Sequence, residues 1–406
     1  MFSKFHTLFD ALTRTEQRVF QSAVFVFTFS LIIGGVSSFY RGTTLAPVAG
    51  GSYTEGIVGQ PIAINPIISS GGDADKDLME IVFRDVISLA QTYKASADYK
   101  TWTVSLKEDL RWSDGEKITS DDIVFTLEAI QNPEARSPLF AAWQGVEAER
   151  TGEREVQFVL KTPYAFFLEN LKGFKVVPEH IFAAIPAENL RLSDYNFEPV
   201  GNGPYAFTGY EKRKDGFITA HRFTANPYYE ANAPLIPELI FRYFPDYESA
   251  LTAFNRREID GLGGLAVDDL AKLKISHQIQ ELTLPRYYAL FFNPNTAPAL
   301  KAAEVREALA LATDKEKLLR DVLLGRGLIM NGPLHPDIAG FDQTALGDRE
   351  FSPEKARTLL ENKGWKTDEF GVRSKKMGKD TVTLSFELIV PQIDFLVKAA
   401  QVVAAD

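Results

Sequence analysis

Residues 19–36 form a long apolar run near the start of the chain. The run carries no charge, and its polar side chains are limited to Gln21, Ser22, Thr28 and Ser30. A helix of about 20 residues spans the roughly 30 Å hydrocarbon core of a membrane. Aromatic residues at positions 39 and 40 would reach the far interface. The pattern therefore predicts a transmembrane anchor over residues 19–40.

Basic residues flank this run asymmetrically. Lys4, Arg14 and Arg18 precede it, whereas Arg41 alone follows closely. Because positive charge is retained on the cytoplasmic side, we expect residues 1–18 in the cytoplasm. The rest of the chain is then extracytoplasmic, in the periplasm or on the outer face of the cell membrane.

Two other interpretations of the apolar run stay open, namely a signal peptide cleaved near Ser37 or Ala49 and a buried core helix. The 18 residues before the run are long for a signal peptide, and no clean Ala-x-Ala site occurs. The run also lacks a polar face, which disfavours a core helix. Residues 41–50 are small and Gly-rich, and they predict a linker.

Alternating apolar and polar residues predict strands in the first half of the chain. Every second residue is apolar in TWTVSL (residues 101–106), and the same alternation recurs over residues 156–160 after a Thr151-Gly152 turn. Thr119 and Asp122 have the spacing of a capping box and predict the start of a helix. Asp215-Gly216 predicts a hairpin with a tight two-residue turn.

Helical spacing is clearer in the second half. VREALALATDKEKLL (residues 305–319) predicts one helix, and Ser352-Pro353 predicts the start of another that runs toward Gly364. Residues 381–390 resemble a strand, and residues 393–405 have helical spacing with no cap at the end. Short strands mixed with isolated helices indicate an α/β protein with mixed sheets. The uncapped apolar helix leads us to expect that the chain ends inside a domain.

Composition excludes several function classes. With 406 residues, 45% of them hydrophobic, the chain is long enough for two or three folded domains. Its formal net charge of −10 gives no basic surface for nucleic acid. Cysteine is absent, which removes disulfides, thiolate catalysis and a lipid-modified cysteine.

No catalytic or metal-binding motif is visible. The chain has no phosphate-binding loop, zinc-protease helix, nucleophile elbow or dinucleotide fingerprint. Its five histidines lack metal-ligand spacing: His6, His180, His221, His277 and His335. The Asp121-Asp122 pair is a candidate acid and base, although helix capping explains it better. We therefore expect no catalytic residue, no metal ligand and no cofactor.

Several segments together carry a family resemblance. GNGPYAF (residues 201–207) resembles the GTGPY element of the extracytoplasmic solute-binding proteins of ABC importers, in the peptide, dipeptide and nickel-binding family known as family 5. It is followed in the family's order by ITAHRFTANPYYEANAPLIPELIFRYFPD, FNRREIDG, YYALFFNPN, VREALALATDKEKLL and SPEKARTLLENKGW. Upstream, GGSYTEGIVGQPIAINPI and WTVSLKEDLRWSDGEKITSDDIVFTLEAI also match. Asn202 replaces the usual Thr, and Arg257 replaces the usual Gly.

The resemblance implies a two-lobe periplasmic-binding-protein fold of type II. Residues 51–75 and 192–265 would form lobe I, with residues 76–191 as an inserted third subdomain. Residues 266–406 would form an incomplete lobe II, truncated at its C-terminal part.

The same resemblance implies a function and a site. The segment at residues 60–70 borders the family's ligand cleft, so Gln60, Ser69 and Ser70 are candidate ligand-binding residues, and Asn293 follows the strand-like YYALFF at a comparable edge. The expected function is capture of a small solute, with a peptide favoured, by hinge closure between lobes. The expected partners are ABC permease and ATPase subunits, and the protein itself is expected to be a monomer. A membrane-anchored hydrolase of peptides or glycans and a receptor feeding a sensor remain as alternatives.

Overall fold

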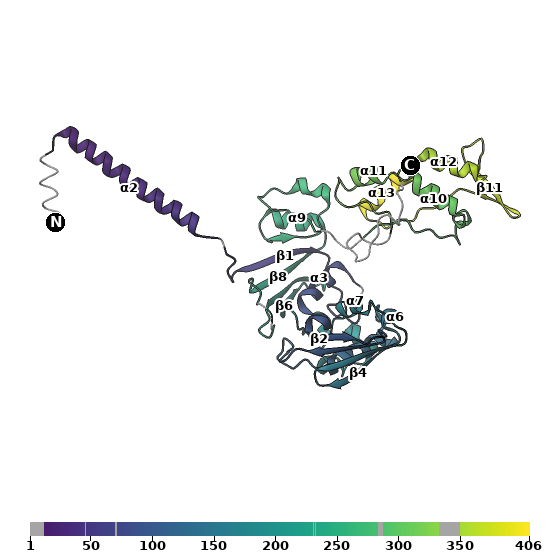
Figure 1. Cartoon of the computed structure of the whole chain (residues 1–406), viewed down its shortest axis with the longest axis horizontal. Coiled ribbons are helices and arrows are strands. Elements are labelled where there is room, and N and C mark those ends of the chain that lie inside the picture. The colour runs from purple at the N-terminus through teal and green to yellow at the C-terminus, as the bar shows by residue number, and fades with distance from the viewer. Residues whose placement is uncertain are drawn as a thin grey trace. The chain divides into compact units, whose positions relative to one another are not determined.

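A computed structural model describes residues 12–44, 46–69, 71–229, 231, 233–282, 287–332 and 350–406. The chain divides into two compact units, unit 1 (Met1–Gly264) and unit 2 (Leu265–Asp406). Each unit has its own sheets and helices (Figure 1).

The predicted apolar helix is present as α2 (Arg14–Gly42). Thr13 caps it in a reciprocal box with Glu16, because the Thr13 amide donates to the Glu16 carboxylate at 2.8 Å. Its apolar window has a mean hydropathy of 2.0, and none of its residues is buried. The helix is long and apolar enough to cross a membrane, and its exposure does not fit a buried core helix.

Unit 1 contains two sheets. The first is five-stranded in the order β6-β7-β8-β1-β9, with β1 parallel to β8 and β9 and with β6, β7 and β8 antiparallel. Its strands are β1 (Ser52–Val58), β6 (Tyr205–Lys212), β7 (Ile218–Ala225), β8 (Glu238–Phe244) and β9 (Gly261–Leu262). The second is antiparallel in the order β2-β3-β5-β4. Its strands are β2 (Ala90–Ala95), β3 (Thr101–Leu106), β4 (Val146–Gly152) and β5 (Glu155–Leu160).

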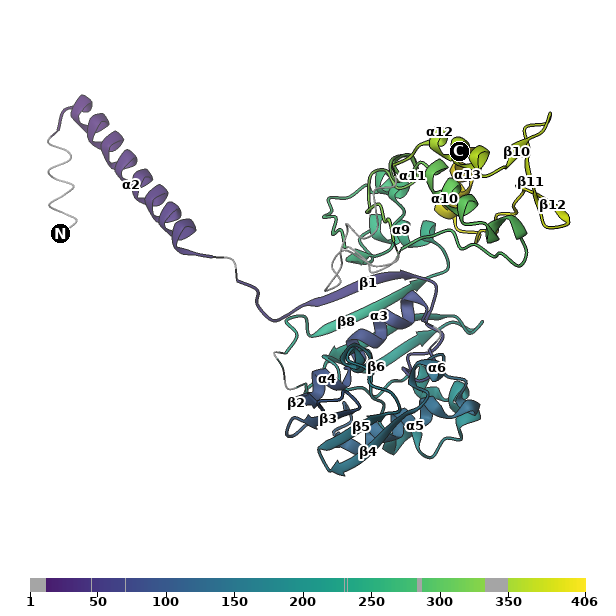
Figure 2. The same cartoon turned by 45° about the vertical axis from the view of Figure 1, so that its right-hand side comes forward.

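Short helices join and cover these sheets. Helix α3 lies across one face of the first sheet (Figure 2), and α5 packs on the second. The helices of unit 1 after α2 are α3 (Asp73–Val82), α4 (Val86–Leu89), α5 (Ser120–Gln131), α6 (Phe140–Trp143), α7 (Phe167–Lys172), α8 (Glu179–Phe182) and α9 (Tyr247–Asn255). Short 3-10 turns lie at Pro133–Ala135, Ala187–Leu192 and Asp194–Asn196.

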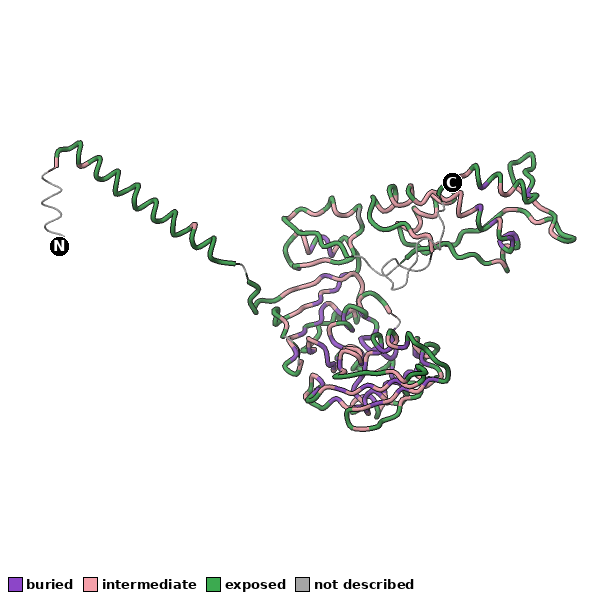
Figure 3. Tube along the Cα trace, viewed as in Figure 1, coloured by how far each residue is buried: buried purple, intermediate pink, exposed green. Residues whose placement is uncertain are grey.

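One apolar core joins both sheets of unit 1. It contains 36 buried residues, which come from the loop after β1, from α3 and α5, and from both sheets (Figure 3). The predicted capping box starts α5, since the Asp122 carboxylate accepts from the Thr119 amide at 2.8 Å. The alternation in β3 buries Trp102, Val104 and Leu106. The predicted start of α5 and the predicted strand over residues 101–106 are therefore confirmed, and the apolar face of each packs into this core.

Unit 2 has a smaller core. Its elements are α10 (Ala303–Ala312), α11 (Lys315–Asp321), α12 (Pro353–Asn362), α13 (Asp394–Ala405), β10 (Lys366–Thr367), β11 (Arg373–Met377), β12 (Asp380–Thr383) and two 3-10 turns, Val267–Lys272 and Pro298–Lys301. The three strands form an antiparallel sheet in the order β10-β11-β12. The main apolar cluster has five buried members: Ala299, Leu300, Ala302, Val305 and Trp365.

Two local predictions differ from the structure in detail. The single helix predicted over residues 305–319 is two helices, because Asp314 interrupts it and caps α11 by accepting from the Lys317 amide at 2.8 Å. The hairpin between β6 and β7 is confirmed, but its turn is longer than predicted. The Gly216 amide donates to the Arg213 carbonyl at 3.0 Å, and Gly216 alone in this loop has a positive φ of 93°. This is the three-residue loop with a glycine bulge.

Two predicted strands in unit 2 are wrong wholly or in part. YYALFF (residues 287–292) belongs to no strand, and the strand predicted over residues 381–390 is regular only as far as Thr383. A strand needs a ladder partner to satisfy its backbone. Within the described part of unit 2, residues 287–292 and 385–390 pair with no strand, and large side chains stay exposed there, including Phe291 at 86% and Ile389 at 85%.

Candidate solute-binding site

The predicted site begins in the loop that follows β1. Gln60 is exposed, and its side-chain carbonyl accepts from the Ile218 amide at the start of β7, at 2.7 Å. Gly59, with φ +90°, donates its amide to the Phe244 carbonyl at 2.8 Å. The start of the loop is therefore held by β7 and β8. Because the side-chain oxygen of Gln60 is used in this contact, its side-chain amide nitrogen is the group that could donate to a solute.

Ser69, at the other end of the loop, is buried at 8% exposure. Its hydroxyl accepts from the Gly71 amide at 3.2 Å and lies beside the carboxyl of Asp75. Asp75 is 1% exposed, and its Oδ1 accepts from the amides of Ile62 at 2.7 Å and Ala63 at 3.2 Å. Burial raises the pKa of Asp75 above its ordinary value. Ser69 thus takes part in holding the loop.

The middle of the loop is held by buried polar side chains. Asn65 accepts from the Ile67 amide at 3.0 Å and donates to the Asn196 side chain at 3.0 Å. The Ile64 amide donates to the Asn196 carbonyl at 2.8 Å, and the Ser137 hydroxyl donates to the Ile67 carbonyl at 2.5 Å. The loop is consequently fixed from two places in unit 1, by Ser137 after the 3-10 turn Pro133–Ala135 and by Asn196 in the 3-10 turn Asp194–Asn196.

The other two predicted site residues lie elsewhere. Ser70 is outside the described residues. Asn293 belongs to unit 2, where it is exposed and its side-chain carbonyl accepts from the Asn295 amide at 3.1 Å. The structure thus brings Gln60 and Ser69 onto one loop, and it describes Asn293 in a separate unit.

Asp75 is a residue that sequence reasoning missed. It lies in an acidic stretch, DADKD, that reads as a solvated helix start. In α3, however, the buried residues are Asp75, Leu78, Met79 and Val82, at helical spacing. A carboxylate inside an otherwise apolar stripe was the signal that would have identified it.

The GNGPY element is a structural junction. A Cβ at Gly201 would lie 2.0 Å from the Val82 carbonyl oxygen, and one at Gly203 would lie 2.5 Å from that of Ile81. The Gly203 amide donates to the Val82 carbonyl at 2.7 Å. Asn202 is 2% exposed and accepts from the Arg84 amide at 2.7 Å. These contacts hold the end of α3 against the segment that leads into β6. The GNGPY element therefore has a structural role.

A ring cluster packs beside the first sheet of unit 1. His221 is fully buried, its Nε2 donates to the Phe197 carbonyl at 3.0 Å, and its ring meets Tyr243 edge-on at 5.6 Å. Burial lowers the pKa of His221 to about 4. His221 is therefore a neutral packing residue at neutral pH.

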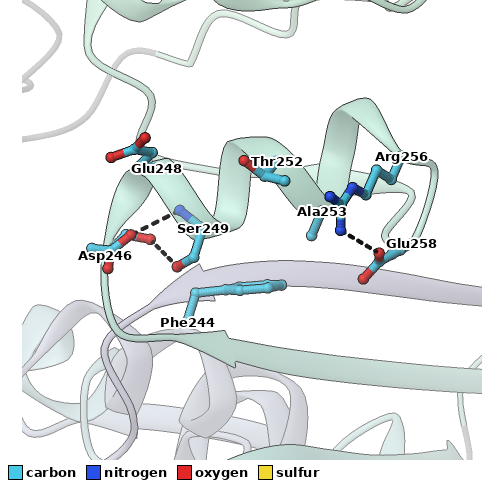
Figure 4. Close-up of a pocket in the computed structure, with 8 residues that line it drawn as sticks. All are labelled: Phe244, Asp246, Glu248, Ser249, Thr252, Ala253, Arg256 and Glu258. Atoms are coloured by element: carbon cyan, nitrogen blue, oxygen red, sulfur yellow. Dashed lines mark hydrogen bonds and ion pairs between the residues drawn. The ribbon is translucent and has the colours of Figure 1, made fainter.

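Unit 1 has surface depressions whose lining does not include residues 60–70. One lies along α9 (Figure 4), where Asp246 caps the helix by accepting from the Ser249 amide at 2.8 Å and Arg256 approaches Glu258 to 3.9 Å. Another lies on the second sheet, where Arg154 pairs with Glu108 at 2.8 Å. Their charged groups serve caps and ion pairs.

The candidate acid and base pair serves helix geometry. Asp122 accepts from the Thr119 amide and, at 2.9 Å, from the Glu179 amide, while Asp121 pairs with Arg150 at 3.0 Å. Burial raises the pKa of Asp122 to about 6. Among the residues that the structure describes, no group of three or more His, Asp or Glu side chains is arranged to hold a metal ion.

Comparison with known proteins gives one consistent result. The sequence profile of the bacterial extracellular solute-binding proteins, family 5, middle region, matches residues 86–405. The oligopeptide-binding protein AppA of Bacillus subtilis is 26% identical over 355 residues, covering 83% of this chain and 64% of AppA.

Solved structures agree with that match. NikZ of Campylobacter jejuni, solved with Ni(L-His), has a TM-score of 0.70 and 26% identity over 87% of this chain and 71% of its own. The ABC transporter substrate-binding protein CtaP of Listeria monocytogenes has a TM-score of 0.64 and 28% identity over 79% of this chain and 66% of its own. The fold is therefore the two-lobe α/β fold that the sequence predicted.

The chain spans between 49% and 64% of the length of the first curated relatives that it matches. The profile match nevertheless covers most of the chain, from Val86 to Ala405, and the fold agrees. The chain belongs to the bacterial extracellular solute-binding proteins of family 5.

Proposed function

We propose that this chain is the membrane-tethered, extracytoplasmic solute-binding subunit of an ABC importer, and that its solute is a peptide. The observation that carries the proposal is the family match over residues 86–405. Relatives named for oligopeptide binding and for ABC transport support the peptide and the permease as partners. The hydrolase alternative has no support among these relatives, which are named as binding proteins.

The proposed tether is α2. Its length, its hydropathy and its lack of buried residues suit a helix that sits in lipid, and the basic residues before it suit an N-terminus on the cytoplasmic side. Alkaline extraction of membranes tests this directly. The full chain should stay in the membrane fraction, and a chain starting at Gly51 should be released. Recovery of the full chain in the soluble fraction, shortened at its N-terminus, would support a signal peptide instead.

The proposed mode of capture is closure of unit 1 and unit 2 around the solute. Gln60, Ser69 and Ser70 would contact it from unit 1, and Asn293 from unit 2. The fixed loop of unit 1 would lose little conformational freedom on binding, which favours affinity. A closed form populated by the solute would then be the form recognised by the permease.

Spin labels can measure closure without background, because the chain has no cysteine. Glu149→Cys and Lys363→Cys introduce one label in each unit at exposed positions. Pools of tripeptides, each varied at one position, serve as the probe for the full chain in detergent. The label distance should shorten with a retained peptide, and that peptide should be recovered intact. An unchanged distance across every pool, or cleaved peptides, would overturn the proposal.

A further inference from the structure

The loop after β1 has one outward-facing side chain in its described middle part. Every residue from 61 to 69 is buried except Ile62, whose side chain is 67% exposed. The neighbours Ala63, Ile64 and Ile67 are 6%, 0% and 0% exposed. The loop thus turns its apolar residues inward and leaves a single large apolar group facing solvent.

Ile62 is exposed and yet held in place. Its amide donates to Asp75 Oδ1 at 2.7 Å, and the next amide, that of Ala63, donates to the same oxygen at 3.2 Å. Asp75 is itself 1% exposed within α3. Two adjacent amides on one buried carboxylate fix the backbone on both sides of the Ile62 side chain.

Exposed apolar residues are common on protein surfaces and usually mean nothing by themselves. Where such a residue lies on a flexible segment, binding must first order its backbone, and this costs conformational entropy. Ile62 differs because its backbone is ordered in advance by a buried acceptor, so an apolar contact there costs little conformational entropy. It also lies two residues from Gln60, on the loop proposed to face the solute.

We propose that Ile62 is an apolar contact for a side chain of the bound peptide, and that Asp75 is the positioning residue that holds Ile62 in place. This inference rests on the proposed function and makes it more specific, because it names an apolar peptide side chain as the group recognised by unit 1. Both amides donate to Oδ1 of Asp75, and Asn keeps a side-chain oxygen at that position, so we expect that Asn can replace Asp75.

Ile62→Ser in the full chain tests the contact. Phe166→Ser is the matched control, because Phe166 is 68% exposed in the same unit but lies outside this loop. Tripeptide pools varied in one residue at a time are incubated with the protein in detergent, and retained peptides are identified by mass spectrometry. Ile62→Ser should weaken retention of peptides that carry Leu, Val or Phe at the varied position about tenfold, compared with peptides that carry Ala there. The unfolding midpoint of the protein should not change. Phe166→Ser should change neither quantity.

Hydrogen exchange tests Asp75 without any ligand. Asp75→Ala should speed exchange of the Ile62 and Ala63 amides at least tenfold while β6 and β7 stay protected. Asp75→Asn keeps an acceptor oxygen, so it should retain both the protection and the peptide preference of the wild type. If Asp75→Ala does not fold, Asp75→Asn still decides: loss of peptide preference with intact loop protection would contradict a positioning role.

The outcomes separate this inference from the proposed function. Retention of no tripeptide by the wild type would overturn both the peptide-binding function and the Ile62 contact. Retention that Ile62→Ser leaves unchanged would overturn the contact alone. Unchanged amide exchange in Asp75→Ala would overturn the positioning role alone.

Discussion

Unit 1 and unit 2 come from one chain and use the same kinds of elements, yet their interiors differ. Unit 1 joins two sheets through a cluster of 36 buried apolar residues, whereas the main cluster of unit 2 has five (Figure 3). In unit 1 the large exposed side chains are scattered over the folded part. In unit 2 they recur along two extended segments, residues 287–292 and 386–389.

The contrast between the two units shows what a strand-like sequence pattern needs in order to form a strand. TWTVSL becomes β3 because β2 and β5 flank it and give its backbone partners on both edges. YYALFF is at least as rich in strand-forming residues, but among the described residues no strand pairs with it. Side-chain preference is therefore insufficient where the ladder and the packing surface are not supplied.

The largest expected effect comes from replacing one buried tryptophan in each of the two cores. Trp112 in unit 1 and Trp365 in unit 2 are both fully buried. Replacing a buried Trp with Ala costs about 3–5 kcal/mol. We expect Trp365→Ala to abolish cooperative unfolding of unit 2, because Trp365 is the largest of five core residues. Trp112→Ala should weaken unit 1 and leave it folded, because 35 other core residues remain.

Hydrogen exchange followed by mass spectrometry resolves the two units in the full chain. In Trp365→Ala the protected amides of α10 and α12 should become as fast as exposed ones, with unit 1 unchanged. If unit 2 kept its protection, its stability would have to come from contacts other than this cluster.

The next largest effect concerns the junction between α3 and β6. In Gly201→Ala the new Cβ would lie 2.0 Å from the Val82 carbonyl oxygen and 2.4 Å from a Val82 methyl group. Since a backbone atom must move, we expect unit 1 to lose about 3 kcal/mol of unfolding free energy. Gly209→Ala in β6 is the control, because nothing lies within 4 Å of its Cβ position. Equal urea midpoints for the two variants would contradict the close approach.

Much of unit 1 was predictable from its sequence because its signals are local. The Thr119 capping box, the alternation in β3 and the glycines of GNGPY each follow from a few adjacent residues. The turn between β6 and β7 was misjudged because Asp215-Gly216 also suits a longer loop in which Gly216 alone has a positive φ. In unit 2 the break at Asp314 was missed because its apolar spacing continues across the interruption.

The candidate site was harder to read. Gln60 and Ser69 were chosen by family resemblance. A resemblance indicates which segment borders the ligand cleft, but it does not say which atoms of that segment face the ligand. That Ser69 is buried, and that one carboxylate holds Ile62 and Ala63, depends on how α3 packs on the first sheet. Asp75 contacts the loop only because α3 packs beside it in the folded protein. The one local sign of this contact in the sequence is the position of Asp75 on the buried face of α3.

A smaller effect concerns acid, and here unit 1 contains two opposing groups. His221 has a folded pKa of about 4, below its ordinary 6.5, so its contribution to stability is present above pH 6.5 and is lost as pH falls toward 4. Asp122 has a folded pKa of about 6, above its ordinary 3.8, so its contribution is present below pH 3.8 and is lost as pH rises through 6. Between pH 4 and 6 the two slopes have opposite signs.

Asp122→Asn should unmask the His221 slope. We expect its unfolding free energy to fall more steeply than that of the wild type between pH 6 and 4, by up to about 1.4 kcal/mol per pH unit. The unfolding free energy of unit 1 is measured by urea titrations at half-unit pH steps, in which hydrogen exchange reports the fraction of unit 1 that is unfolded. Parallel pH profiles for the two proteins would mean that Asp122 titrates near its ordinary value.

The smallest effect lies just after α9. Arg257 has φ +59°, a left-handed conformation that costs a residue with a side chain about 1 kcal/mol or more relative to glycine. Arg257→Gly relieves this strain but gives the unfolded chain more freedom, so we expect a net stabilisation of about 0.5 kcal/mol. The adjacent Arg256 has φ −90°, where a side chain is unstrained, so Arg256→Gly should destabilise instead. Opposite shifts of the thermal midpoint in these neighbouring variants would show that the backbone decides the outcome, because both variants remove one arginine charge and the exposed Arg256–Glu258 pair, at 3.9 Å, contributes little. Shifts of the same sign would mean that charge or helix capping dominates at this end of α9.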